Sequence, residues 1–179
     1  MSFPPVEIQQ LVDQIASILI SNNQTLGVSE GACGGLLSAY IISIPGASTF
    51  FDGGRLIYSL RSRLKLSGWD IEQIKSYTGP SEQVALKLAR NLRVEFGSSW
   101  IVSETGYAGP TTKVCNDNAS INSLNLNEDE VGTVYLGISG PTGNFSKKIQ
   151  TGITERQENM QLFAKLALEF LLEILIQQK

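Results

Sequence analysis

Apolar residues recur every three or four positions in three long segments of the chain, residues 5–22, 81–97 and about 154–178. This spacing is typical of amphipathic helices, so each segment is predicted to form one. Ser81 stands where it can cap the second helix. The third segment is apolar around much of its circumference, which predicts a helix that packs deeply or covers a subunit interface.

Short apolar runs bounded by glycine or polar residues alternate with these helices. They predict strands over residues 25–30, 53–59 and 99–106, and a hairpin of residues 131–139 and 144–152 around the turn GPTG. Shorter helices are predicted over residues 34–44, over 59–68 and from Asp70 onward. This alternation predicts one α/β domain over residues 1–179, a three-layer α/β/α sandwich with a mixed sheet.

The overall composition is that of an ordinary globular domain. Of the 179 residues, 42% are hydrophobic and 17% charged, and the net charge is −3. Because no cluster of lysine and arginine stands out, nucleic acid is not an expected partner. The N-terminal residues lack the pattern of a secretory signal, and no apolar run reaches membrane-spanning length. The protein is therefore expected to be cytoplasmic, with no membrane partner.

The types of residue present restrict the chemistry. The chain contains no histidine, which excludes histidine-based triads and most catalytic zinc sites. Its two cysteines, Cys33 and Cys115, do not make a disulfide framework and are expected to be reduced. Carboxylates such as Glu30 and Asp52 are isolated in the sequence. We therefore expect no metal site and no cofactor.

Three loops stand out, at residues 30–35, 52–63 and 105–112. In α/β sheets, ligands bind at the carboxyl ends of strands, where such loops meet. The first loop, EGACGG, contains Gly31, Gly34 and Gly35. These glycines would let a ligand approach the backbone, and a following helix would direct free N–H groups at an anion. The same glycines are also consistent with a simple tight turn, which their spacing alone favours.

The other two loops also allow two interpretations each. If a helix begins near Tyr58, the phenol of Tyr58 lies on the same helical face as Arg61 or Ser62 and Lys65. This face would either contact a phosphate or be a solvated basic surface. The loop after the next strand contains Thr105, Gly106 and Gly109, which suit a ligand or an ordinary turn. Beyond it, residues 111–130 have no clear period, which predicts a loop that is functional or disordered.

The loops belong to an ordered set of motifs that resembles one known family. The chain contains SEGACGGL at 29–36, PGAS at 45–48, GG at 53–54, YSLRSR at 58–63, SE at 81–82, TGYAGP at 105–110 and VGTV at 131–134. In this order the motifs resemble the CinA C-terminal domain family, whose enzymatic members are nicotinamide mononucleotide deamidases. The resemblance covers almost the whole chain. It implies hydrolysis of the nicotinamide carboxamide to the acid and ammonia.

In the mechanism that the resemblance implies, a serine attacks the amide carbon, a lysine takes its proton, and a tyrosine and backbone amides assist. The serine position is Gly31 in this chain, and the lysine position is Arg63. Glycine has no side chain to attack with, and arginine stays protonated, so it cannot act as a general base. The tyrosine is kept as Tyr58.

The resemblance further implies a set of ligand-binding residues, namely Glu30, Gly34, Gly35, Thr105, Gly106, Gly109 and, displaced by two positions, Arg156. We therefore expect a family member that has lost canonical deamidase chemistry and keeps a pocket for a nicotinamide nucleotide. One alternative is an amidohydrolase that uses the Cys33 thiol as nucleophile or acts on another substrate. Another is a non-catalytic interaction protein. Self-association into a homo-oligomer is implied by the resemblance.

Overall fold

The computed structural model describes residues 3–112 and 130–178. Its centre is a mixed five-stranded sheet with the strand order β2-β1-β3-β4-β5. β1 pairs in parallel with both β2 and β3, whereas β4 pairs antiparallel with β3 and with β5. The strands are β1 (Leu26–Glu30), β2 (Phe51–Leu56), β3 (Trp100–Gly106), β4 (Thr133–Gly140) and β5 (Gly143–Gln150).

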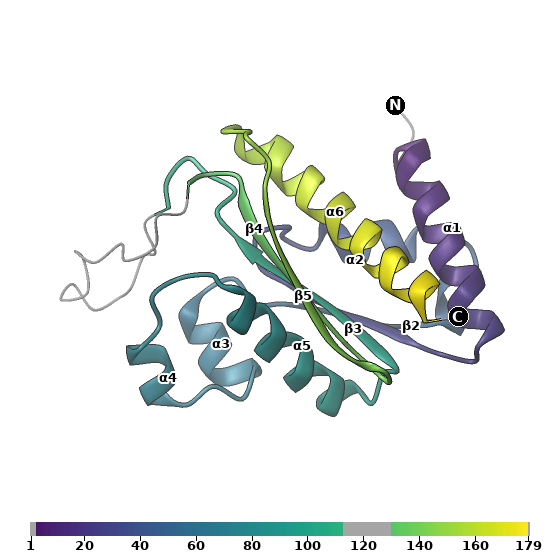
Figure 1. Cartoon of the computed structure of the whole chain (residues 1–179), viewed down its shortest axis with the longest axis horizontal. Helices are drawn as coiled ribbons and strands as arrows, with labels where there is room; N and C mark the ends of the chain where they lie inside the picture. The colour runs from purple at the N-terminus through teal and green to yellow at the C-terminus, as the bar shows by residue number, and fades with distance from the viewer. Residues whose placement is uncertain (1–2, 113–129, 179) are drawn as a thin grey trace.

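Helices cover both faces of this sheet (Figure 1). One face carries α1 (Val6–Ser21), α2 (Leu36–Ile42) and α6 (Arg156–Gln177), which pack on one another and on the sheet. The other face carries α5 (Glu82–Phe96), with α3 (Leu60–Leu66) and α4 (Ile71–Lys75) beside it, and a short 3-10 turn, Ala47–Thr49, precedes β2. The predicted three-layer α/β/α sandwich is confirmed.

The larger hydrophobic core lies between the sheet and the layer of α1, α2 and α6. The deep packing predicted for the last helix is confirmed, because Phe163, Ala167 and Leu171 are fully buried, although Leu166 is only partly buried. Across the described residues, none of the helices has the length and apolar character needed to cross a membrane. Most of the predicted loop 111–130, with Cys115, lies outside the described residues.

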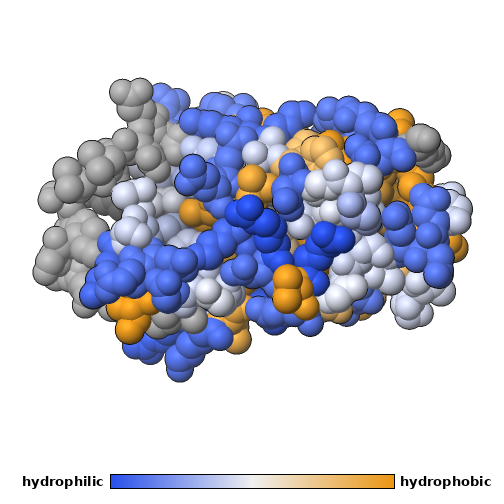
Figure 2. All heavy atoms as spheres, turned by 60° about the horizontal axis from the view of Figure 1, so that its bottom comes forward, coloured by the Kyte–Doolittle hydropathy of each residue, from blue (hydrophilic) through white to orange (hydrophobic). Residues whose placement is uncertain are grey.

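The side of the molecule that carries α3, α4 and α5 is mostly hydrophilic, and its hydrophobic areas are small and separate (Figure 2). Large exposed apolar side chains on these three helices are Leu66, Ile71 and Val94. Isolated exposed side chains of this kind are normal on globular proteins.

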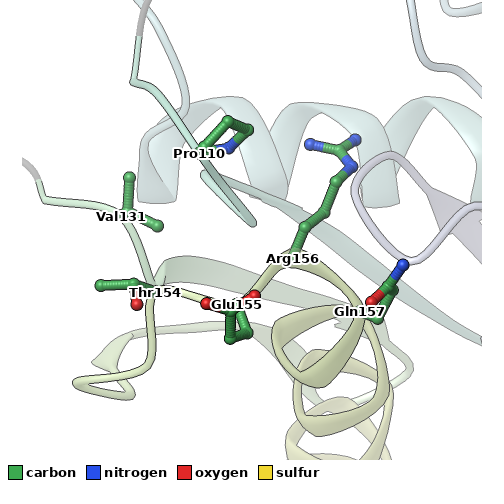
Figure 3. A pocket seen from close by; sticks show the side chains of 6 residues that line it. All are labelled: Pro110, Val131, Thr154, Glu155, Arg156 and Gln157. Atoms are coloured by element: carbon green, nitrogen blue, oxygen red, sulfur yellow. The ribbon is translucent and has the colours of Figure 1, made fainter.

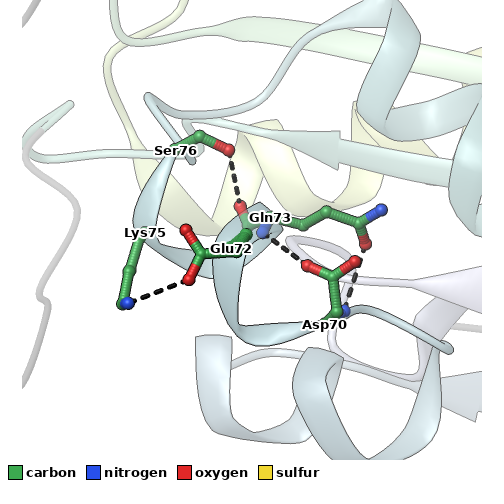
Figure 4. Close-up of polar contacts among 5 residues, drawn as sticks. All are labelled: Asp70, Glu72, Gln73, Lys75 and Ser76. Atoms are coloured by element: carbon green, nitrogen blue, oxygen red, sulfur yellow. Dashed lines mark hydrogen bonds and ion pairs between the residues drawn. The ribbon is translucent and has the colours of Figure 1, made fainter.

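Local sequence signals set the ends of the helices on this side. Ser81 caps α5 as predicted, because its hydroxyl accepts a hydrogen bond from the Val84 N–H. At α4, the Asp70 carboxylate accepts from the Gln73 N–H and the Gln73 side chain accepts from the Asp70 N–H, which is a capping box (Figure 4). This box stabilises a helix of only five residues. The helix is flanked by Trp69 and Tyr77, which pack against each other.

The predicted helical face that begins at Tyr58 is wrong. Ser59 is the N-cap of α3 and its hydroxyl accepts from the Ser62 N–H, so Tyr58 precedes the helix. Tyr58 therefore does not share a helical face with Arg61 and Lys65. Serine at this point offers the backbone a cap that competes with earlier helix propagation.

Candidate functional site

The carboxyl ends of β1, β2 and β3 lie at one edge of the sheet, because these three strands run parallel. The loops that follow them surround a cavity of about 510 Å³. The structure thus brings together seven of the predicted site residues as its lining: Gly31, Tyr58, Arg63, Thr105, Gly106, Gly109 and Arg156. Glu30, Cys33, Gly34 and Gly35 do not line it.

Arg63 is the most constrained charged group of the cavity wall. Its side chain is 5% exposed, with Nη1 donating to Tyr77 Oη at 2.9 Å and Nη2 donating to Thr105 Oγ1 at 3.1 Å. The guanidinium carbon lies 5.6 Å from the Trp69 ring centre and 5.0 Å from that of Tyr77, within the range of cation–π contacts. The helix that carries Arg63 and the capped α4 segment together fix this guanidinium at the cavity.

Tyr77 keeps a neutral phenol beside this cation. Burial raises the pKa of the Tyr77 phenol, and the charge and hydrogen bond of Arg63 offset part of the rise. The phenol oxygen therefore accepts from Arg63 without supplying a negative charge.

Gly31 lies directly beside the Arg63 guanidinium. A Cβ built on Gly31 would stand 3.9 Å from Arg63 Nη2 and 3.3 Å from the Glu104 carbonyl oxygen. The positions that the resemblance assigns to nucleophile and base are thus adjacent in space. Neither carries the group that the assigned role needs, because glycine has no nucleophile and a guanidinium has no acceptor lone pair.

The backbone amides of the first loop are occupied by Glu104, a residue of β3. The Gly31 and Cys33 N–H groups donate to Glu104 Oε1 at 2.6 and 2.8 Å, and the Ala32 N–H donates to Oε2 at 3.2 Å. The Glu104 side chain has no exposure to solvent. Burial raises the pKa of this carboxyl, and the hydrogen bonds from Cys33 and Gly31 offset part of the rise.

Glu30 occupies the amides at the start of α2 in a similar way. Its carboxylate accepts from the N–H groups of Gly35, Leu37 and Ser38 and from the Ser38 hydroxyl. Gly34 and Gly35 have positive φ values of 67° and 98°, which favours glycine at both positions. In the first loop, these two glycines therefore shape a turn, while the chain's own carboxylates accept from its N–H groups.

The Cys33 thiol is buried in the larger core and away from the cavity. Burial, and then the nearby carboxylates of Glu104 and Glu30, raise the pKa of this thiol well above its ordinary value. A thiol is nucleophilic only as the thiolate. The structure therefore gives no support to Cys33 as a replacement nucleophile.

The rim of the cavity is formed by Tyr58 and Arg156. Tyr58 is 67% exposed, and its hydroxyl accepts from Arg156 Nη2 at 3.1 Å, while Nη1 donates to the Gly109 carbonyl. Arg156 and Pro110 also line a neighbouring cavity of about 480 Å³. Figure 3 shows the Arg156 side chain extending from the start of α6, away from Glu155.

The loop after β3 is held in place by Asn159 of α6. This fully buried side chain donates to the carbonyls of Ala108 and Ile153 at 3.0 and 2.9 Å and accepts from the Thr151 hydroxyl at 2.7 Å. Gly109 is required beside it, because a Cβ there would lie 2.9 Å from the Thr154 carbonyl oxygen and φ is 111°.

Sequence reasoning did not single out Glu104, Tyr77 or Asn159. A signal existed for Glu104, which is the one charged residue in the buried strand WIVSETG. No sequence signal marked Asn159, whose partners lie in other elements. Among residues 3–112 and 130–178, no group of three or more histidine, cysteine or acidic side chains is arranged to hold a metal ion.

The chain matches a protein-family model described as the CinA C-terminal domain over residues 8–175. It is similar to a CinA-like protein of Chlorobium limicola, with 30% identity over 88% of this chain and 35% of that protein. A CinA-like protein of Synechococcus elongatus is 34% identical over 79% of this chain and 31% of its own length. The chain thus spans about a third of these relatives.

Solved structures share the fold over nearly their whole length. The competence/damage inducible protein CihA from Agrobacterium tumefaciens matches with a TM-score of 0.82 and 25% identity, over 97% of this chain and 98% of its own. A competence-damaged protein (CinA) superfamily protein from Escherichia coli matches with a TM-score of 0.81 and 19% identity, over 97% and 94%.

Proposed function

This chain belongs to the CinA C-terminal domain family, and from that premise we propose that its cavity binds a nicotinamide nucleotide without hydrolysing it by the serine–lysine route. The observation that carries the proposal is the adjacency of Gly31 and Arg63 at the cavity wall. The resemblance assigns these two positions to the nucleophile and the base, and neither residue has the required group. Removing such a nucleophile or base from a hydrolase costs on the order of a millionfold in turnover.

Oxyanion stabilisation is also compromised in this cavity. A tetrahedral intermediate needs N–H donors that are free to receive its developing charge. The N–H groups of residues 31–33 already donate to the Glu104 carboxylate. An oxyanion at the same place would have to displace the buried Glu104 carboxyl group from these donors. This supports the loss of acyl-transfer chemistry, independently of the missing side chains.

The features that favour binding are retained. The volume of about 510 Å³ falls within the range of small-molecule sites. Among residues 3–112 and 130–178, the lining contains two arginines and three tyrosines and no acidic side chain, which suits an anionic ligand with an aromatic ring. Such a composition fits a pyridine nucleotide better than a neutral or cationic molecule.

Two measurements on the purified protein test this proposal. We expect nicotinamide mononucleotide to raise the melting temperature, since a ligand that binds only the folded form stabilises it, while no ammonia is released above the buffer rate. Arg156→Ala should reduce the shift, whereas Arg90→Ala, a change of an exposed α5 residue outside the cavity, should not. Robust ammonia release would overturn the proposal. No shift with any pyridine nucleotide would favour a pure interaction protein.

A further inference from the structure

We propose that the cavity selects a heteroaromatic carboxylate over the corresponding carboxamide, and that Arg63 is the residue that makes this selection. The inference rests on the proposed function, because it names the ligand class of the same cavity. It would make the chain a sensor or carrier of an acid rather than a processor of an amide.

The first argument is that the charge of Arg63 is buried without an anion. At 5% exposure, the guanidinium has given up most of its hydration. Its hydrogen bonds go to two neutral hydroxyls, those of Tyr77 and Thr105. Within the described residues, no carboxylate forms an ion pair with it. A buried charge without a counter-ion is costly, and buried charges in proteins are normally paired.

The second argument is that the guanidinium has donors left over. A guanidinium carries five N–H donors, and two of the five are used in the hydrogen bonds to Tyr77 and Thr105. Nη1 and Nη2 each keep a second N–H for a ligand, while the Nε atom has no hydrogen-bond partner and is itself buried. A carboxylate can accept two N–H groups of arginine in parallel, and this is among the strongest hydrogen-bonded pairs in proteins. A carboxamide offers one acceptor oxygen and turns an N–H₂ group toward the cation.

The third argument is the room that Gly31 leaves beside Nη2. The position of the absent side chain lies 3.9 Å from Arg63 Nη2 and borders the cavity. Because position 31 has no side chain, a carboxylate in the cavity can approach Nη2 without a side chain between them. Glycine at position 31 and arginine at position 63 are thus complementary in this arrangement, since one supplies space and the other supplies charge.

The fourth argument concerns the rest of the lining. The nearby carboxylates of Glu30 and Glu104 accept hydrogen bonds from backbone amides and are absent from the lining. Tyr58, Tyr77 and Tyr107 line the cavity and offer flat faces to an aromatic ring. Arg156 stands at the rim, where a second anionic group such as a phosphate would meet a cation. The lining therefore fits an aromatic acid with a second negative group.

Calorimetric titration of the wild-type protein with nicotinate mononucleotide and with nicotinamide mononucleotide tests the inference, because the two probes differ only in the acid and amide groups. We expect at least about tenfold tighter binding of the acid, as charge-assisted hydrogen bonds are roughly twice as strong as neutral ones. Arg63→Gln should abolish the preference, and Arg63→Lys should keep part of it. Arg61→Gln, which alters an exposed residue of the same helix outside the cavity, is the matched control.

The outcomes separate this inference from the proposed function. Equal affinity for both probes in the wild type would overturn the acid selection and leave the proposed nucleotide binding intact. Binding of neither probe would overturn both. Hydrolysis of the amide would overturn the proposed function. The affinity for the acid could still be measured by titration with nicotinate mononucleotide, which is the product of that hydrolysis. If Arg63→Gln does not fold, as judged by circular dichroism, the inference is decided by the ratio of the wild-type affinities for the two probes and by the same ratio for Arg63→Lys.

Discussion

The backbone N–H of Gly31 donates a 2.6 Å hydrogen bond to the carboxylate of Glu104. This bond joins the loop after β1 to the neighbouring strand β3, and the N–H groups of Ala32 and Cys33 add to the same carboxylate. The loop at the position where the family resemblance places a nucleophile is thereby closed on a carboxyl group of the chain itself. At this position the loop has no nucleophilic side chain, and the N–H groups of residues 31–33 already donate to Glu104.

The first prediction concerns the pH dependence of stability. Burial raises the pKa of Glu104 in the folded protein above its unfolded value, so its protonated form is favoured by folding. The contribution of Glu104 to the free energy of unfolding is therefore fully present at pH values below the pKa of an unfolded glutamate. This contribution is lost as the pH rises through the raised pKa of the folded protein. In urea titrations, the stability of the wild type relative to Glu104→Gln should decrease as pH rises.

Glu169→Gln, a substitution at an exposed position of α6, is the control for this experiment. The wild type should show no comparable pH trend relative to this variant. A relative stability of wild type over Glu104→Gln that grows with pH would show that the folded protein instead favours the ionised Glu104.

The second prediction is that restoring a serine alone does not restore catalysis. Gly31→Ser should fold, at a cost of about 1 kcal/mol, because its Cβ would lie 3.3 Å from the Glu104 carbonyl oxygen and the loop must shift slightly. We expect no ammonia from nicotinamide mononucleotide, since Arg63 cannot take the serine proton. The companion variant Gly31→Ser/Arg63→Lys supplies the missing base. Ammonia release by Gly31→Ser alone would contradict this explanation.

The third prediction concerns the Cys33 thiol. In a Cys115→Ser background, Cys33 should resist an aromatic disulfide reagent in the native protein and react fully in denaturant, because it is buried and its pKa is raised. Cys33→Ala should leave nucleotide binding unchanged. Rapid labelling of the native protein, or loss of an amidase activity with Cys33→Ala, would support the thiol mechanism instead.

The fourth prediction concerns Asn159. Asn159→Ala removes the donors to two backbone carbonyls and should lower the free energy of unfolding by about 2–4 kcal/mol. Because one of these carbonyls belongs to Ala108 in the cavity lining, nucleotide affinity should also fall. Gln161→Ala, at an exposed position of the same helix, should change neither quantity. A stable Asn159→Ala variant with wild-type affinity would show that the loop is held by other contacts.

The helices and strands were predictable because each depends on nearby residues. The period of the apolar positions predicted α1, α5 and α6, and the turn GPTG predicted the hairpin of β4 and β5. The same logic failed at Tyr58, because the Ser59 side chain caps the start of α3 and Tyr58 therefore precedes the helix. The start of α3 depends on the hydrogen bond from the Ser62 N–H to the Ser59 hydroxyl, which the period of the apolar positions does not reveal.

The candidate site was predictable only in part. Loops after parallel strands had to meet, so Gly31, Arg63 and Thr105 could be expected at one place. The role of Glu104 could not be expected, because it depends on β1 and β3 being neighbours in a register that pairs Ser29 with Ser103. That pairing sets the carboxylate beside the loop that follows β1. Asn159 likewise acts across elements that are distant in sequence.

The measurement that tests the central claim most directly is a calorimetric titration of the wild-type protein with nicotinamide mononucleotide, followed for an hour after the last injection. We predict a saturable binding isotherm whose heat returns to baseline, because the Gly31 and Arg63 site binds the nucleotide and does not turn it over. A steady heat flow that scales with protein concentration and is accompanied by ammonia would contradict the claim.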